Sequence, residues 1–418
     1  RGGARAGGGD GGGGCAGGAG GAVGAGPYAA ARLVGGSRSE AFTAVAVVRV
    51  VGGGAGDVDA PAARCAPGYG VPDEVTGRSL LNQTGGFGAY DALAEAADGE
   101  LGETFGAFSY ANANYDLLGR VVEGASGEDY ARYLDEHVLE PLGMASTTAD
   151  PARAEALGMV PGHRDWFGLP VADGFRHAQG DGAWGGPASG YVASSVRDMA
   201  SYLRMYLNGG MGGDGARVLS ADSVRRMFLD RVPDPEGDTY YGMGWTSFSW
   251  DDGELVLSHD GQVENYTASM CLLPERGIGI VALTDANDNA GGNIRFFDLV
   301  GGVVSVAIGG TGQPMDDAWT WAWRQRVDVL YASALLLAVS PLLLTGRWRR
   351  RLSAACRGGV APIVRARSLR MLLVRGVLLH VALPACILAL SFVWGVQWSD
   401  PLTFPPDITT AILPRQGL

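Results

Sequence analysis

The chain changes character near residue 318, and this break limits the folds that are open to it. Residues 1–318 contain 41 acidic residues and 20 arginines, a net charge of −21, whereas residues 319–418 carry +9 and are rich in apolar side chains. The acidic first part argues against nucleic-acid binding. The basic, apolar second part is typical of a membrane segment. We therefore expect a water-exposed domain followed by a membrane-associated tail.

The tail contains two stretches long and apolar enough to cross a bilayer, residues 327–345 and 371–398. About 20 residues span a hydrocarbon core of roughly 30 Å. Eight arginines lie between the stretches: Arg347, Arg349, Arg350, Arg351, Arg357, Arg365, Arg367 and Arg370. Five tryptophans lie at their other ends: Trp319, Trp321, Trp323, Trp394 and Trp398. Because arginine-rich loops stay in the cytoplasm and tryptophan gathers at membrane interfaces, we expect the acidic domain and the C-terminus outside the cell membrane. A buried globular helix is the alternative for the first stretch.

Composition sets the other boundaries. Residues 1–26 contain 15 glycines and offer no side chains for a core, so we predict that they are disordered. Residues 27–310 form the globular domain and residues 311–326 a juxtamembrane linker. Residues 346–370 form a cytoplasmic loop and residues 399–418 a tail.

The residue pattern of the globular part predicts an α+β fold. Helices are expected at residues 37–51, 114–123, 128–139, 195–208, 221–229 and 293–308. Antiparallel strands are expected at residues 241–246, 254–259, 266–273 and 277–284. Residues 151–190 have no clear period and predict a long surface excursion. Helices followed by a meander of strands indicate α+β rather than an alternating α/β sheet.

Lysine is absent from all 418 residues, which excludes every mechanism that needs an amine. The five cysteines include no C-x-x-C pair, and the five histidines include no H-E-x-x-H motif. A disulfide framework, a zinc site and a metallohydrolase are therefore not expected. We predict a site that uses no metal and no other cofactor.

Three short segments carry residues suited to nucleophilic chemistry. Ser37 begins a predicted helix, where the positive end of the helix dipole could hold a developing oxyanion. Tyr110 and Asn112 lie in a loop before another helix. His259, Asp260 and Gly261 are predicted to end one strand and begin the turn to the next. The alternatives are an ordinary helix-capping serine, a packed loop tyrosine, and a strand-end histidine that pairs with Asp260.

These segments resemble the serine β-lactamase and penicillin-binding-protein superfamily, in its class C-like branch of D-alanyl-D-alanine carboxypeptidases, esterases and peptidases. G-S-R-S-E-A-F-T-A at residues 36–44 is similar to the first motif of that branch, Y-A-N at 110–112 to the second, and H-D-G at 259–261 to the third. L-L-N-Q-T-G-G at 80–86, E-P-L-G-M at 140–144 and S-S-V-R-D-M-A at 194–200 resemble three further segments. The resemblance covers roughly residues 34–308 and implies an antiparallel sheet flanked by helices with an all-helical subdomain.

The resemblance implies catalytic roles for four residues. Ser37 is the expected acylated nucleophile, and Tyr110 relays its proton as a phenolate or through hydrogen bonds. His259 orients the substrate carboxylate or the tyrosine. Glu40 stands where the family has a lysine, one helical turn from the serine, whose charge lowers the pKa of the tyrosine and the serine. Because a carboxylate has the opposite effect, the resemblance implies either an impaired site or one in which Glu40 itself acts as the base.

The resemblance also implies substrate contacts. Asn112 is expected to contact the substrate amide, and Gly261 to lie beside the substrate. The backbone N–H groups of Ser37 and Gln262 are expected to form the oxyanion hole. Two further departures are Gln83 in place of a histidine, and two missing strands before the nucleophile, where this chain has its glycine tract.

Three functions follow as hypotheses. The first is a membrane-anchored extracytoplasmic serine hydrolase that acts on D-alanyl peptides of peptidoglycan, β-lactams or small esters. The second is an inactive binding module with the same fold, held at the lipid bilayer. The third is a structural or transporter-like membrane protein, which two spans make the weakest. The oligomeric state stays open.

Overall fold

The structure is a computed structural model. It describes residues 11–16, 22–24, 29–55, 57–89, 91–96, 99–166, 168–235, 237–250, 253–288, 292–312, 325–343, 346–347, 349–350, 353–354, 370–371, 373–386 and 389. The chain divides into two units. Unit 1 comprises Arg1–His163, Ala172–Asn287 and Phe297–Gln313, and unit 2 comprises Arg164–Val171, Asp288–Phe296 and Pro314–Leu418.

Unit 1 is built on an eight-stranded sheet with the order β2-β1-β12-β11-β10-β9-β8-β7. Its strands are β1 (Gly11–Ala16), β2 (Ala22–Gly24), β7 (Val232–Pro233), β8 (Tyr240–Gly242), β9 (Trp245–Trp250), β10 (Glu254–Val263), β11 (Tyr266–Leu273) and β12 (Ile278–Thr284). Neighbouring strands pair antiparallel, with His259 of β10 opposite Met270 of β11. Strands β3 (Arg32–Val34) and β6 (Ala193–Ser195) form a separate pair. With the helices described below, this sheet confirms the predicted α+β class.

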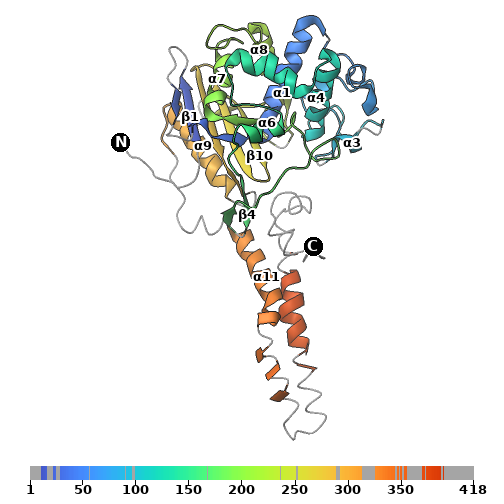
Figure 1. The fold of residues 1–418 in the computed structure, drawn as a ribbon, viewed down its shortest axis with the longest axis vertical. Coiled ribbons are helices and arrows are strands. Elements are labelled where there is room, and N and C mark those ends of the chain that lie inside the picture. The colour runs from blue at the N-terminus through green and yellow to red at the C-terminus, as the bar shows by residue number, and fades with distance from the viewer. Residues whose placement is uncertain are drawn as a thin grey trace. The chain divides into compact units, whose positions relative to one another are not determined.

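Some helices of unit 1 pack against the main sheet and others pack against one another (Figure 1). The helices are α1 (Ser39–Val50), α2 (Gly77–Leu81), α3 (Leu93–Ala96), α4 (Asn112–Ser126), α5 (Tyr130–Leu134), α6 (Pro151–Ala156), α7 (Val196–Leu207) and α8 (Ala221–Leu229), with short turns η2 (Gly36–Arg38), η3 (Val51–Ala55), η4 (Ala62–Arg64), η5 (Pro67–Tyr69), η6 (Asp135–Leu139) and η7 (Glu140–Leu142). Helix α7 packs against β12 and β1, whereas α1 packs against α4 and α5. Residues 39–47 of α1 are all buried, as expected of a helix that is enclosed on every side.

The prediction that residues 1–26 are disordered is wrong for residues 11–16 and 22–24, and so is the prediction of missing strands. β1 pairs antiparallel with β12 and with β2. A sheet ladder joins backbone groups, so a segment without side chains can still pair. The glycine tract therefore supplies the strands that the sequence pattern left unassigned.

Two strand predictions needed correction. Residues 241–246 do not form one strand, because Met243 and Gly244 have φ of +48° and +83° and separate β8 from β9. A Cβ on Gly244 would lie 2.7 Å from the Cα of Ala41, so this turn lies directly against α1. The predicted turn at residues 259–261 lies instead inside β10, which continues to Val263. Gly261 serves a close approach and not a turn, because a Cβ there would lie 2.0 Å from the carbonyl oxygen of Gly35.

The predicted surface excursion at residues 151–190 contains regular structure. Besides α6, it holds the antiparallel strands β4 (His163–Trp166) and β5 (Leu169–Val171). β13 (Ala286–Asn287) and α9 (Asn293–Ala307) follow the main sheet in the sequence.

In the C-terminal part of unit 2, α11 (Arg326–Leu343), labelled in Figure 1, contacts η8 (Leu378–Ala382). The His380 ring lies 2.8 Å from the carbonyl oxygen of Leu337. No helix in the described part of the chain has the length and apolar character required to span a membrane. The predicted transmembrane helices at 327–345 and 371–398 are therefore not supported, since only parts of them lie in described helices. The five tryptophans that flank the predicted membrane spans lie outside the described residues. The same is true of most of the predicted linker 311–326, most of the predicted loop 346–370 and the tail 399–418.

The pairing of β1 with β12 predicts that the glycine tract stabilises unit 1. Deleting residues 1–24 should lower the thermal unfolding midpoint by about 5 °C, because it removes the ladder along β12, and 1 kcal/mol corresponds to roughly 2–4 °C in a domain of this size. Deleting residues 1–9 alone should leave the midpoint unchanged. Equal midpoints for both deletions, measured by differential scanning calorimetry, would show that β1 does not stabilise the fold.

Candidate active site

Ser37 lies in η2, the tight turn immediately before α1, and its side chain is half-buried. The N-cap residue of α1 is Arg38, and no side chain caps this helix. By contrast, Ser195 caps α7 by accepting a hydrogen bond from the Asp198 N–H. The Ser37 hydroxyl instead donates a hydrogen bond to the Tyr110 phenol oxygen. The alternative of an ordinary helix-capping serine is therefore wrong.

The backbone on the N-terminal side of Ser37 lies against strand β10. Gly36 has φ of +59°, and a Cβ there would lie 2.4 Å from the backbone nitrogen of Gln262. Only glycine fits this conformation and this approach. The structure thus brings Ser37, Gly261 and Gln262 together along two adjacent backbone segments.

The Glu40 carboxylate is completely buried and lies at the centre of a hydrogen-bonded group. Its Oε1 accepts a hydrogen bond of 2.5 Å from the Tyr110 hydroxyl, and its Oε2 accepts one from the Tyr241 hydroxyl. The Gln83 amide nitrogen donates to both oxygens, at 3.3 and 3.2 Å. His259 Nε2 lies 3.4 Å from Oε2. Three donors therefore hold a carboxylate where the resembled family has the ammonium of a lysine.

Gln83 is held in a conformation that suits this role. Its φ is +56°, an uncommon value for a residue with a side chain, and its side chain is fully buried. Its Oε1 accepts hydrogen bonds from the Ala111 N–H at 3.0 Å and from Asn114 Nδ2 at 2.6 Å. These bonds direct the amide nitrogen toward Glu40. Backbone strain of this kind persists where the surrounding contacts determine the conformation.

Tyr110 is a protonated phenol in this environment. Burial raises its pKa well above the ordinary value of 10.0, and the nearby charge of Glu40 and the hydrogen bond to that carboxylate raise the pKa further. The Tyr110 and Tyr241 rings meet edge to face, with centroids 6.1 Å apart. Of the two predicted forms of Tyr110, the structure favours the hydrogen-bonded relay over the phenolate.

His259 is buried, and its ring bridges two partners. Nδ1 donates to the backbone carbonyl of Asp260 at 2.9 Å, because a carbonyl oxygen can only accept. Nε2 lies 3.3 Å from the Tyr241 hydroxyl. The alternative that His259 pairs with the Asp260 side chain is wrong, because successive side chains of a strand point to opposite faces.

Asn112 is the one predicted site residue that the structure does not bring into this group. It begins α4, and its Nδ2 donates to the backbone carbonyl of Trp184 at 3.4 Å. Tyr241 and the bridging role of Gln83 were missed from the sequence. The sequence did contain a signal for Gln83, because Gln83 and Glu40 both depart from the pattern of the resembled family.

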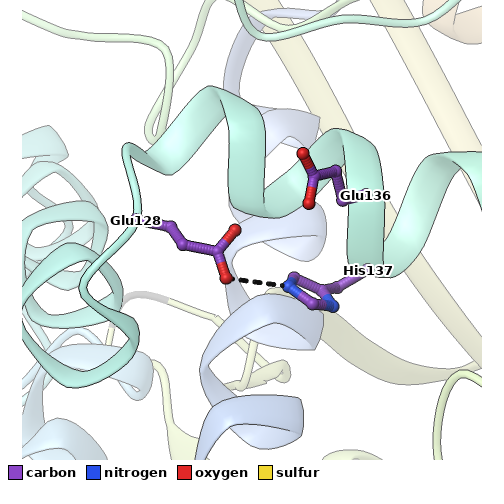
Figure 2. Close-up of side chains that lie close together, drawn as sticks. All are labelled: Glu128, Glu136 and His137. Carbon is purple, nitrogen blue, oxygen red and sulfur yellow. Dashed lines mark hydrogen bonds and ion pairs between the residues drawn. The ribbon is translucent and has the colours of Figure 1, made fainter.

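A second group of polar side chains lies near α5 and η6 (Figure 2). The ligand atoms of Glu128, Glu136 and His137 lie within 4.8 Å of one another, as in a metal site. However, His137 Nε2 pairs with Glu128 Oε1 at 3.2 Å, and Glu136 pairs with Arg132 at 2.8 Å, which lowers the pKa of Glu136. Ion pairs within the protein therefore account for this cluster.

Residues 22–298 match the Beta-lactamase family. The chain belongs to this family. Its Beta-lactamase-family region is 27% identical over 278 residues to penicillin-binding protein 4 of Amycolatopsis lactamdurans, an alignment that covers 60% of this chain and 71% of that protein. It is 25% identical over 273 residues to protein flp of Staphylococcus aureus (strain MW2), of which the alignment spans only 52%.

Solved structures share the fold of this Beta-lactamase-family chain. The octameric penicillin-binding protein homologue from Pyrococcus abyssi has a TM-score of 0.60 and 22% identity, covering 72% of this chain and 74% of its own. The class C β-lactamase from Rhodobacter sphaeroides has a TM-score of 0.55 and 20% identity, covering 67% and 90%. The predicted membership of the serine β-lactamase and penicillin-binding-protein superfamily is therefore confirmed.

Asp116, one turn after Asn112 on α4, makes stability depend on pH. Burial raises its pKa from 3.8 to about 7, although hydrogen bonds from Ser189 and from the Gly186 N–H oppose this shift. A pKa that is higher in the folded state stabilises the fold at low pH, and this stabilisation is lost as pH rises through about 7. Wild type should therefore lose about 1 kcal/mol or more between pH 5 and pH 8 that Asp116→Asn does not lose.

Urea unfolding at the two pH values measures this difference. Asp222→Asn, an exposed aspartate on α8 that pairs with Arg225, is the matched control and should behave like wild type. An Asp116→Asn variant that loses as much stability as wild type would contradict the assignment.

Proposed function

We propose that this chain is a serine hydrolase that forms an acyl-enzyme at Ser37, with Glu40 in place of the family lysine as the final proton acceptor. One observation carries the proposal. The Ser37 hydroxyl donates to Tyr110, and the Tyr110 hydroxyl donates to Glu40 at 2.5 Å, so an unbroken chain of hydrogen bonds joins the nucleophile to a carboxylate. Such a chain activates a weak nucleophile by removing its proton as it attacks.

In the acylation step, Ser37 Oγ forms a bond to the substrate carbonyl carbon, and the C=O π electrons move to the oxygen. The Ser37 proton passes to Tyr110 Oη, while the Tyr110 proton passes to Glu40 Oε1. When the tetrahedral intermediate collapses, the bond to the leaving group breaks and the leaving group receives the proton back through Tyr110. The backbone N–H groups of Ser37 and Gln262 hold the oxyanion. Water then releases the acyl group by the same route.

Tyr110 acts in this scheme as a relay that is never left as a phenolate. Its raised pKa means that a free phenolate is disfavoured, whereas simultaneous loss and gain of a proton leaves it neutral. Tyr241 and Gln83 keep the carboxylate oriented through their hydrogen bonds to it. His259 lies beside both Tyr241 and Glu40 and completes the enclosure.

The substrates proposed from the family are D-alanyl peptides of peptidoglycan, β-lactams and small esters. Gly261 and Asn112 are the proposed substrate contacts, from the edge of β10 and the start of α4. No metal or other cofactor takes part in the proposed reaction.

A second candidate is an inactive binding module of the same fold. The observation that favours it is the carboxylate itself, since a negative charge at position 40 raises the pKa of Tyr110 instead of lowering it. Under this candidate the site around Ser37 still binds a D-alanyl peptide or a partner protein, but Ser37 is not acylated.

Covalent labelling with a fluorophosphonate and a fluorescent penicillin distinguishes the two candidates. Wild type should be labelled, Ser37→Ala should not, and Glu40→Gln should react about 10²–10⁴-fold more slowly, because it loses the base. Glu136→Gln, the same change in an exposed glutamate paired with Arg132, is the control and should react like wild type.

The double variant Glu40→Lys with Gln83→His restores the family pair at both positions. If wild type is unlabelled while this variant or Glu40→Lys alone is labelled, the inactive binding module is correct. Absence of label in every variant would rule out an acyl-enzyme at Ser37.

We also propose that the tail anchors the domain at the cell membrane, with the domain on the extracytoplasmic side. Apolar side chains on the described helical residues of the tail support its contact with lipid, since Val329, Leu336, Leu373 and Val381 are each at least 60% exposed. Exposed apolar side chains gathered in one region mark a surface that contacts a membrane or another protein.

Cysteine accessibility in intact cells tests the topology. In a variant with Cys356 as the only cysteine, an impermeant maleimide should react only after the cells are permeabilised, because the residue lies in the predicted cytoplasmic loop. A variant with Ala152→Cys on the exposed face of α6 as its only cysteine should react without permeabilisation. The reverse pattern would contradict the proposed orientation.

A further inference from the structure

Arg38, the residue after the proposed nucleophile, carries a buried positive charge. Its side chain is only 1% exposed and is among the largest fully buried side chains of the chain. None of its three guanidinium nitrogens has a hydrogen-bond partner among the residues that the structure describes. Burial lowers its pKa to about 9, so the group remains charged at neutral pH. An unpaired buried charge destabilises the folded state, so its presence requires an explanation.

The Arg38 guanidinium lies against the backbone turn that carries Ser37. The side chain folds back over Gly35, where a Cβ would lie 2.5 Å from Arg38 Nε and 3.1 Å from Nη2. Gly35 is two residues from Ser37, and consecutive Cα atoms are 3.80 Å apart, so the charge lies within about 10 Å of the Ser37 backbone. Gly36, between them, lies against the backbone nitrogen of Gln262.

The N-terminus of α1 adds to this positive potential. α1 has 12 residues, and the exposed N–H groups at the start of such a helix carry a partial positive charge. Glu40, the nearest acid along the chain, forms no ion pair with Arg38 and is held by Tyr110, Tyr241 and Gln83. The charge of Arg38 is therefore not neutralised by an ion pair within the described residues.

We propose that Arg38 supplies the positive charge that stabilises the oxyanion formed when Ser37 attacks, a charge that the family lysine would otherwise bring to the site. This inference rests on the proposed acyl-enzyme. The guanidinium nitrogens of Arg38 form no hydrogen bond with Ser37 or another described residue, so Arg38 is a positioning residue that acts through space. Because it is buried, solvent ions screen its field little.

The test compares Arg38→Met and Arg38→Lys with wild type. Two quantities are measured for the reaction with a fluorophosphonate: the saturating rate constant and the half-saturating concentration. In this reaction Ser37 Oγ bonds to phosphorus, negative charge develops on the phosphoryl oxygen, and fluoride leaves. Arg38→Met should lower the saturating rate about 10–100-fold and leave the half-saturating concentration within about twofold. Arg38→Lys keeps the charge and should retain most of the rate.

The thermal unfolding midpoint distinguishes this electrostatic role of Arg38 from a purely structural one. Removal of an unpaired buried charge should raise the thermal unfolding midpoint of Arg38→Met by about 3–10 °C. Arg49→Met is the matched control on the same helix, about 16 Å further along it. Arg49 donates to the Val218 carbonyl at 2.6 Å, so its replacement should not raise the midpoint and should leave the rate unchanged.

A slower Arg38→Met with a raised midpoint supports the proposal. An Arg38→Met variant that reacts as fast as wild type overturns it, as does one whose rate and midpoint both fall, because Arg38 would then be a structural residue. If wild type itself is not labelled, the proposed acyl-enzyme fails and the inference fails with it. Wild-type labelling with an unaffected Arg38→Met overturns the inference alone.

Discussion

The buried carboxylate of Glu40 is the contact on which the rest of the site depends. It is reached by Tyr110 from the loop before α4, by Gln83 from the turn after α2, and by Tyr241 from β8. His259 approaches it from β10. One carboxylate thus ties helical segments to the main sheet within unit 1. A buried carboxylate is costly unless donors satisfy it, and here Tyr110, Tyr241 and Gln83 supply those donors.

The exchange of charge at position 40 alters its surroundings. An ammonium would need acceptors, whereas Glu40 needs donors, and Gln83 supplies an amide nitrogen where the family has a histidine. The Tyr110 phenol keeps its proton, because burial and the nearby charge of Glu40 raise its pKa. A buried positive charge without a hydrogen-bond partner among the described residues lies at Arg38, the residue after Ser37. The proposed hydrolase mechanism uses these three features.

The sequence allowed the α+β class and the order of Ser37, Tyr110 and His259 to be predicted, because helix periods and short motifs depend on local residues. Tyr241 could not be predicted as a site residue, because its role comes from contact with Glu40, 201 residues away along the chain. The strands in the glycine tract were missed because glycine leaves no alternating pattern, and their ladder with β12 joins backbone groups alone. Gly261 was assigned to a turn because glycine favours turns, whereas here it allows the approach of Gly35.

The central claim is that Tyr110 remains a neutral phenol between Ser37 and Glu40. Ultraviolet difference titration of wild type against Tyr110→Phe, followed at the phenolate absorbance, measures the ionisation of this one tyrosine. We expect no difference between the two proteins from pH 6 to about pH 10, the ordinary pKa of a tyrosine, because the pKa of Tyr110 is raised well above that value. A phenolate signal near neutral pH in wild type that is absent from Tyr110→Phe would contradict it.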